Sequence, residues 1–110
     1  ALAKGDGKLH FFVPNVLNGM NLVDISAGCS TASTSGTPEF QIYNVTDKQD
    51  ILSTTLTIDA NEKHSSTAAT AAVINTSYDD VATGDELRVD VDTAGTGTKG
   101  CQVDLIFQLS

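Results

Sequence analysis

The chain has 110 residues but no tryptophan, only two prolines, two cysteines and six basic residues. So few lysines and arginines argue against binding to a nucleic-acid backbone or an anionic membrane, because both require clustered positive charge. No apolar run approaches the roughly 20 residues of a membrane-spanning helix. The first residues also lack the layout of a signal peptide, so we expect no export.

Helical periodicity is also missing, since no segment of 10–15 residues has apolar residues at helical spacing. What remains is rich in threonine, serine and glycine, with 40% hydrophobic residues and a formal net charge of −8. That hydrophobic content is too high for a disordered chain. β-branched residues punctuated by Gly, Asn and Asp predict strands and turns.

Alternating polar and apolar residues predict where the strands lie. We expect strands at residues 9–13, ended by Pro14, and at 20–27, with Val23, Ile25 and Ala27 on one face. Two hairpins are predicted, the first from residues 39–45 and 51–58 and the second from 86–92 and 101–109. Because the chain ends on a regular strand, we expect that strand to lie between two neighbours in its sheet.

These segments predict an all-β fold, a single antiparallel β-sandwich or jelly roll of seven or eight short strands. Residues 9–110 would form the domain, and residues 1–8 a flexible N-terminal arm. The Ala/Thr run at residues 67–74 fits either a short strand or a helical turn, and periodicity does not choose between them.

The two cysteines favour reduced thiols, although a disulfide between them stays open. Cys101 is in phase with Val103, Leu105 and Phe107, where a small apolar residue fits the core. Neither Cys29 nor Cys101 has a nearby Cys or His in sequence, so we expect no metal site there.

No catalytic signature is present, and we assign no catalytic or cofactor-binding residue. The segment "GTGTKG" lacks the spacing of a phosphate-binding loop. His64, with Glu62 and several hydroxyl groups nearby, is conceivable as a general base, but an exposed polar loop is the simpler interpretation. His10 alternates with Leu9 and Phe11, which predicts a position on the solvent side of a strand.

The acidic residues raise the possibility of a cation site, because hard cations take oxygen ligands. Their spacing matches no calcium loop, and a row containing Arg88, Asp90 and Asp92, with Glu86 beyond it, predicts a solvated, partly self-neutralised strand face. We therefore assign no metal site. The acidic residues considered are Asp79, Asp80, Asp85, Asp90 and Asp92. Asn44 and Asn75 match glycosylation acceptors formally, and we interpret both as chance matches.

Three segments taken together, "ILSTTLTIDANEKHSSTAATAAVIN", "DDVATGDELRVDVD" and "GTGTKGCQVDLIFQL", resemble a group of small β-sandwich virion proteins of tailed bacteriophages. The resemblance covers roughly residues 38–109, and no single motif in it is diagnostic. Cys101 departs from the pattern, which has Leu there. The resemblance implies a jelly-roll subunit similar to capsid decoration, or cement, proteins, which bind the outside of the head and strengthen it.

The resemblance further implies a homo-oligomer, a trimer by preference, that binds the major capsid protein on the outer virion surface after synthesis in the host cytoplasm. The N-terminal arm would add to the sheet edge of a neighbouring subunit. Apolar residues on the outer strand faces would be buried in the oligomer, with Leu22, Tyr43, Val45 and Ile106 as candidates. The alternatives are a tail, neck or head-fibre component, and a receptor- or carbohydrate-binding module that uses Tyr78 in its "SYDD" loop.

Overall fold

A computed structural model of the chain describes residues 2–109, and these residues form an all-β structure. Two short 3₁₀ turns, η1 (Asn15–Leu17) and η2 (Ser65–Thr67), are the helical elements of that part of the chain. None of its helices is long or apolar enough to span a membrane. The strands are β1 (Gly5–Phe12), β2 (Met20–Thr31), β3 (Glu39–Asn44), β4 (Gln49–Asp50), β5 (Leu52–Thr54), β6 (Leu56–Thr57), β7 (Val73–Ile74), β8 (Glu86–Thr93) and β9 (Lys99–Leu109).

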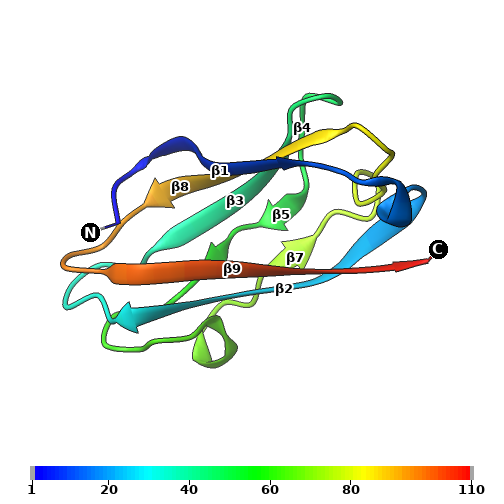
Figure 1. Ribbon diagram of the computed structural model, residues 1–110. Coiled ribbons are helices and arrows are strands. Elements are labelled where there is room, and N and C mark those ends of the chain that lie inside the picture. Colours follow the sequence, from blue (N-terminus) through cyan, green and yellow to red (C-terminus); the bar gives the residue numbers. More distant parts are fainter. Residues whose placement is uncertain (1, 110) are drawn as a thin grey trace.

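All strand pairs within residues 2–109 are antiparallel, and they form three sheets. The largest sheet has the order β1-β8-β3-β4, with β6 paired to β3. The long strands β2 and β9 form a second sheet, and β5 pairs with β7 in a third. Figure 1 shows β2 and β9 running side by side along one layer, with β1, β8 and β3 in the other. This arrangement is compatible with the predicted β-sandwich.

The core lies between these layers and is built from alternate residues of each long strand. β8 contributes Leu87, Val89 and Val91, while β3 contributes Phe40 and Ile42. In the segment 51–58, Ile51, Leu52, Leu56 and Ile58 are likewise buried. From the other layer come Leu22, Ile25, Ala27 and Cys29 of β2, with Cys101, Val103, Leu105 and Phe107 of β9 packed against them.

The predicted closing hairpin is wrong. β8 pairs with β1 and β3, whereas β9 pairs with β2, so the link between them crosses from one layer to the other. Both strands are apolar on one face. Placed in opposite layers they bury those faces against each other, which one shared sheet would not allow. Among the described residues 2–109, β9 therefore has one strand neighbour and not the predicted two, while β8 is central in its sheet.

The crossing link is held by a small buried hydroxyl network. The Ser33 hydroxyl donates to the backbone oxygen of Ser35 at 2.7 Å and accepts the amide of Thr96 at 3.1 Å. The Thr98 hydroxyl donates to the backbone oxygen of Ala94 at 2.8 Å. These bonds fix the Thr/Gly segment between the layers.

The predicted inward face of β2 is wrong at one end. Ile25 and Ala27 are buried as expected, but Val23 is 45% exposed and Leu22 takes its place in the core. The cause is an irregularity in the pairing with β9 between Leu22 and Asp24, which reverses the phase of the strand.

The hairpin predicted from residues 39–45 and 51–58 is confirmed at its two ends. β3 pairs with β4 at Tyr43–Asp50 and Asn44–Gln49 and with β6 at Glu39–Thr57 and Phe40–Leu56, but between them the chain leaves β3 to form β5. Where β5 leaves β3, the Gln41 side chain makes the hydrogen bonds that backbone pairing would otherwise make. Its Nε2 donates to the backbone oxygen of Leu52 at 2.9 Å, and its Oε1 accepts the amide of Leu52 at 3.0 Å.

Two further segments complete the comparison with the sequence. β1 begins at Gly5, ahead of the residue 9 predicted for this strand, so residues 5–8 belong to it. The undecided run at 67–74 contains both alternatives, because η2 ends at Thr67 and β7 follows at Val73. The described part of the chain, residues 2–109, contains nine strands where the sequence predicts seven or eight, since four of them have only two or three residues.

Candidate functional site

The open side between the two layers is bordered by β1 and β9, each of which pairs on one side only within residues 2–109. A cavity of about 170 Å³ lies there and reaches the core. Its apolar lining comes from both layers, from Leu9 of β1 and from Cys101 and Val103 of β9, with Phe40 beneath. Because backbone groups on an unpaired edge can accept another strand, this side is the strongest candidate for an interaction surface.

Exposed apolar side chains accompany this open side. On β9, Ile106 is 51% exposed and Leu109 is 73% exposed, while Leu9 and Phe12 of β1 are also exposed. Four of the large apolar residues that are exposed thus lie on the two edge strands, and exposed apolar surface of this kind is what a partner covers in an interface.

Of the four residues predicted to be buried in an oligomer, Ile106 alone is strongly exposed. Leu22 is wrong as a candidate because it is 1% exposed and lies in the core. Tyr43 and Val45 are half-buried. The guanidinium of Arg88 lies over the Tyr43 ring, 4.3 Å from its centroid, so that ring already has a partner.

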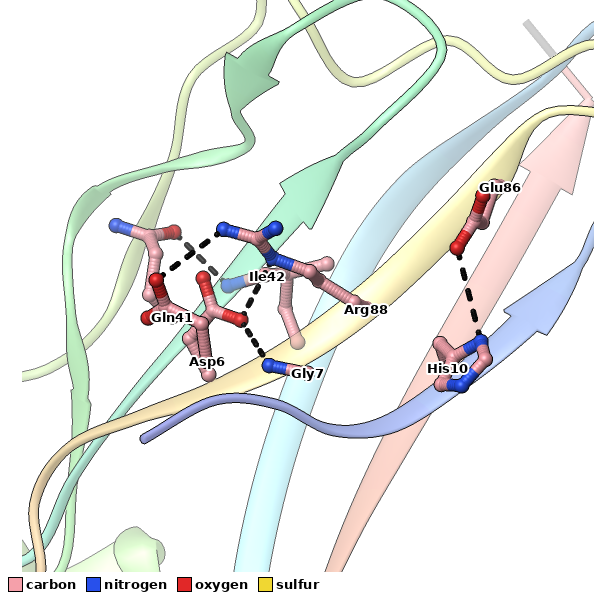
Figure 2. A network of polar contacts seen from close by, with 8 residues as sticks. Asp6, Gly7, His10, Gln41, Ile42, Glu86 and Arg88 are labelled. Carbon is pink, nitrogen blue, oxygen red and sulfur yellow. Dashed lines mark hydrogen bonds and ion pairs between the residues drawn. The ribbon is translucent and has the colours of Figure 1, made fainter. Parts of the chain in front are cut away.

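The outer face of β8 has a polar network centred on Arg88. Its Nε donates to Oδ1 of Asp90 at 2.8 Å, and Nη2 lies 3.5 Å from Oδ2 of Asp6. The amide of Gly7 also donates to Oδ1 of Asp90 at 2.8 Å. Figure 2 shows Arg88 reaching across to Asp6 of the neighbouring strand β1.

This network corrects the predicted solvated face. Asp90 is only 4% exposed, and its charge is balanced by Arg88 rather than by water. The hydrogen bond to Asp90 in turn raises the pKa of Arg88. Self-neutralisation is confirmed, but full solvation is wrong. Burial raises the pKa of Asp92, with the nearby Asp90 charge as the next cause.

The five acidic residues considered for a cation do not gather. Asp79 lies against β2, where its backbone oxygen accepts the amide of Leu22 at 2.8 Å, and Asp80 forms an isolated bridge to Asn21. Asp85 accepts the amide of Ala82 at 3.0 Å in the turn before β8. No group of three His, Cys, Asp or Glu residues within residues 2–109 is placed to hold a metal.

His64 lies in the loop that covers the free edge of β2. Its Nδ1 accepts the amide of Ser66 at 3.0 Å, capping η2. The hydroxyl of Ser65 accepts the amide of Ala27 at 3.0 Å, and Glu62 accepts the hydroxyl of Thr67. Each of these side chains thus makes a contact within the fold, and His64 has a backbone partner rather than a serine hydroxyl.

Two open hollows flank this loop, of about 690 Å³ and about 420 Å³. The larger is lined by the Ala/Ser segment around residues 65–74 and by residues 23–26 of β2. Its lining contains His64 and Asp24 as the titratable side chains. Three serines, Ser26, Ser65 and Ser66, complete its polar lining.

Three further residues singled out in the sequence lie at separate places in the fold. His10 is exposed on β1, as predicted, with Nδ1 3.6 Å from Oε2 of Glu86. Tyr78 is exposed in its loop. Asn44 is buried and its side-chain amide donates to Asp47, which agrees with a chance glycosylation match.

Cys29 and Cys101 lie directly opposite each other on β2 and β9, a juxtaposition that sequence reasoning missed. Both are free thiols, as the sequence favoured. Burial raises the pKa of Cys101, with the neighbouring Cys29 as a further cause. Only the register of β2 against β9 brings the two cysteines together, and the sequence pattern does not predict that register.

Comparisons of the chain with protein-family models, with curated proteins and with solved structures find no match.

Proposed function

We propose that the chain is a structural virion protein of a tailed bacteriophage. Its most direct role is that of a capsid decoration protein, which binds the outer surface of the head and stabilises it by adding contact area. The proposal depends chiefly on one observation, the two unpaired strand edges of β1 and β9 with exposed apolar residues between and beside them. The resemblance of three chain segments to small phage virion proteins gives the kind of partner.

The physical demands of such a role are modest and match these residues. A shell-strengthening protein needs a stable fold, a surface that associates and a charge that keeps free copies apart. A net charge of −8 supplies the last of these and discourages binding to packaged DNA. A jelly-roll connection of the strands is part of this proposal.

The partners proposed are other copies of the chain and the major capsid protein. A trimer requires a head-to-tail contact, in which one patch meets a different patch on the next copy. Edges β1 and β9 are two such patches, because each carries its own set of unpaired backbone groups. Ile106 and Leu109 would be buried in the contact.

Sedimentation and particle binding test the proposal directly. We expect the purified chain to sediment as a trimer and to bind heads that lack it. The double substitution Ile106→Asp and Leu109→Asp should abolish both without loss of the β-sheet circular dichroism signal. Val73→Asp is the matched control, because Val73 is half-exposed on β7, a strand outside the open side, and should change neither result. A monomeric wild-type chain that does not bind heads would contradict the proposal.

A second candidate is a receptor- or carbohydrate-binding module, for example in a tail or head fibre. It is favoured by Tyr78, which is 40% exposed in a loop beside acidic residues and has the aromatic face that sugar rings stack on. Glycan-array binding that is lost in Tyr78→Ala would favour this role, whereas an array without binding would remove it.

A further inference from the structure

We propose that Cys29 and Cys101 form a modification site, a dithiol that a small disulfide oxidises to an internal disulfide between β2 and β9. The inference is independent of the proposed function. It depends on the register of two neighbouring strands and on the hydrogen bonds at one position.

The register places the two cysteines directly opposite each other. Opposite residues of an antiparallel pair point to the same side of the sheet, with Cβ atoms about 4.5–5.5 Å apart. Here that side is the core, because Cys29 is buried and Cys101 packs against the same cluster.

The backbone bonds show which kind of pair this is. The amide of Cys29 donates to the backbone oxygen of Lys63 at 2.8 Å, on the side of β2 that faces away from β9. The amide of Ala27, two residues earlier, likewise donates away from β9, to the hydroxyl of Ser65 at 3.0 Å. Cys29 and Cys101 therefore occupy a non-hydrogen-bonded position, where opposite Cα atoms approach to about 4.5 Å.

That separation suits a disulfide. Cα atoms joined by a disulfide lie about 4.4–6.8 Å apart, with Cβ atoms about 3.5–4.5 Å apart, and non-hydrogen-bonded pairs have the closer Cβ atoms. The two sulfurs can therefore bond after rotation about χ1 and a small approach of the strands. No other thiol exists in the chain to compete for either partner.

Access favours Cys101 as the first thiol to react. It borders the cavity of about 170 Å³ on the open side of the sandwich, whereas Cys29 is buried. The Cys101 thiolate attacks one sulfur of a small disulfide such as oxidised glutathione, and one glutathione thiol leaves. Cys29 loses its proton and attacks the Cys101 sulfur of this mixed disulfide, which releases the second glutathione thiol. Two protein thiols are oxidised, one small disulfide is reduced, and the two protons end on the released thiols.

The rate of the first step should rise with pH. Burial and the neighbouring thiol raise the pKa of Cys101, so little thiolate is present at neutral pH. The resulting bond would join β9, which has one strand partner, to that partner near the crossing link between the layers. Because it closes the long loop from residue 29 to residue 101, it should raise the thermal midpoint.

The test is oxidation of the folded full-length chain with oxidised glutathione at neutral and at mildly alkaline pH. Samples are quenched in acid and alkylated after denaturation. We expect the monomer to lose two hydrogens in mass and to take up no alkyl group, faster at the higher pH. Dithiothreitol should restore both alkylation sites and lower the thermal midpoint to its reduced value.

Three variants separate this reaction from simple thiol reactivity. Cys29→Ser should stop at a glutathione adduct on Cys101, and Cys101→Ser should react more slowly because only the buried thiol remains. The double substitution Cys101→Ala with Gln102→Cys keeps two thiols on the same strands but turns one outward. It should give an adduct and no internal disulfide. A wild-type chain that keeps both thiols, stops at an adduct, forms linked dimers or loses its β-sheet signal on oxidation would overturn the proposal.

Discussion

At the scale of single residues, Arg88 is the side chain on which most polar contacts of the outer face converge. It bonds Asp90, lies near Asp6 and covers the ring of Tyr43. A buried carboxylate that loses its cation is left with an uncompensated charge, which costs more than the pair contributes.

We therefore expect Arg88→Met to lower the free energy of unfolding by roughly 2–4 kcal/mol. The measurement is urea unfolding followed by circular dichroism. Adding Asp90→Asn to Arg88→Met should restore most of the loss, because the amide removes the buried charge and keeps an oxygen for the amide of Gly7. If the double variant is no more stable than Arg88→Met, the buried charge is not the cause.

Gly95 is a second residue whose identity the fold requires. Its φ is +70°, and a Cβ there would lie 2.4 Å from the hydroxyl oxygen and 2.9 Å from the Cβ of Ser33. Ser33 is buried and held by its hydrogen bonds, so it has no room to move. Both backbone strain and overlap oppose a side chain.

We expect Gly95→Ala to cost roughly 2–4 kcal/mol, from the left-handed backbone and the overlap together. Gly97→Ala is the matched control, since Gly97 has φ +76° but a Cβ added there would meet nothing within 4 Å. It should cost only about 1 kcal/mol. Equal losses of thermal stability in the two variants would show that the contact with Ser33 is unimportant.

At the scale of elements, β9 combines regular structure with an unpaired edge. Cys101 is at a non-hydrogen-bonded position opposite β2, so its amide points away from that strand. By alternation the amides of Val103 and Leu105 do the same, whereas those of Gln102 and Asp104 point toward β2.

Hydrogen exchange should therefore alternate along β9 in the isolated chain. We expect the amides of Cys101, Val103 and Leu105 to exchange faster than those of Gln102 and Asp104, because only the latter are paired. Residue-resolved exchange by NMR measures this, with β8, paired on both sides, as the internal control. Uniform protection along β9 would mean that its outer edge is covered. If the protection is uniform in the oligomer but alternates in a monomer, the outer edge of β9 forms the contact between copies.

What the sequence predicts about these elements is the face of each residue, not its partner. Leu87, Val89 and Val91 alternate strictly, and the structure buries all three. Period-two patterns contain no information on pairing, so the hairpin that they predict from β8 and β9 is wrong. The sequence pattern also does not predict the phase change at Val23, because a bulge depends on the neighbouring strand.

The candidate site was less predictable for the same reason. The outward phase of Ile106 predicts that its side chain is exposed in the single chain, and the structure agrees. The contact between Cys29 and Cys101, and the Gln41 side chain that replaces a strand, both arise from pairings distant in sequence. Only the register of the folded sheets brings those atoms together.

At the scale of the whole molecule, the excess of acidic residues opposes folding in a pH-dependent way. Burial raises the pKa of Asp92, followed by the charges of Asp90, Glu39 and other carboxylates on the same face. Asp50 behaves alike, with burial first and Asp90 second. Such groups bind protons more tightly in the folded chain than in the unfolded one. Their contribution to stability is present at low pH and is lost as pH rises from the ordinary aspartate pKa through the raised value.

Asp92→Asn should remove part of this loss. We expect a gain of about 0.5 kcal/mol at pH 7, kept small by solvent screening of a half-exposed side chain, and no gain at pH 3, where the carboxyl is protonated in both states. Thermal unfolding at the two pH values measures the difference, and added salt should shrink it because salt screens exposed charges.

Asp104→Asn is the control, since it removes the same unit of net charge from an exposed position on β9, in the other layer. If Asp104→Asn stabilises the chain as much as Asp92→Asn at pH 7, the effect comes from net charge alone. A gain confined to Asp92→Asn would place the cost of burial and of charge repulsion on the outer face of β8, where Arg88 already neutralises one of the carboxylates.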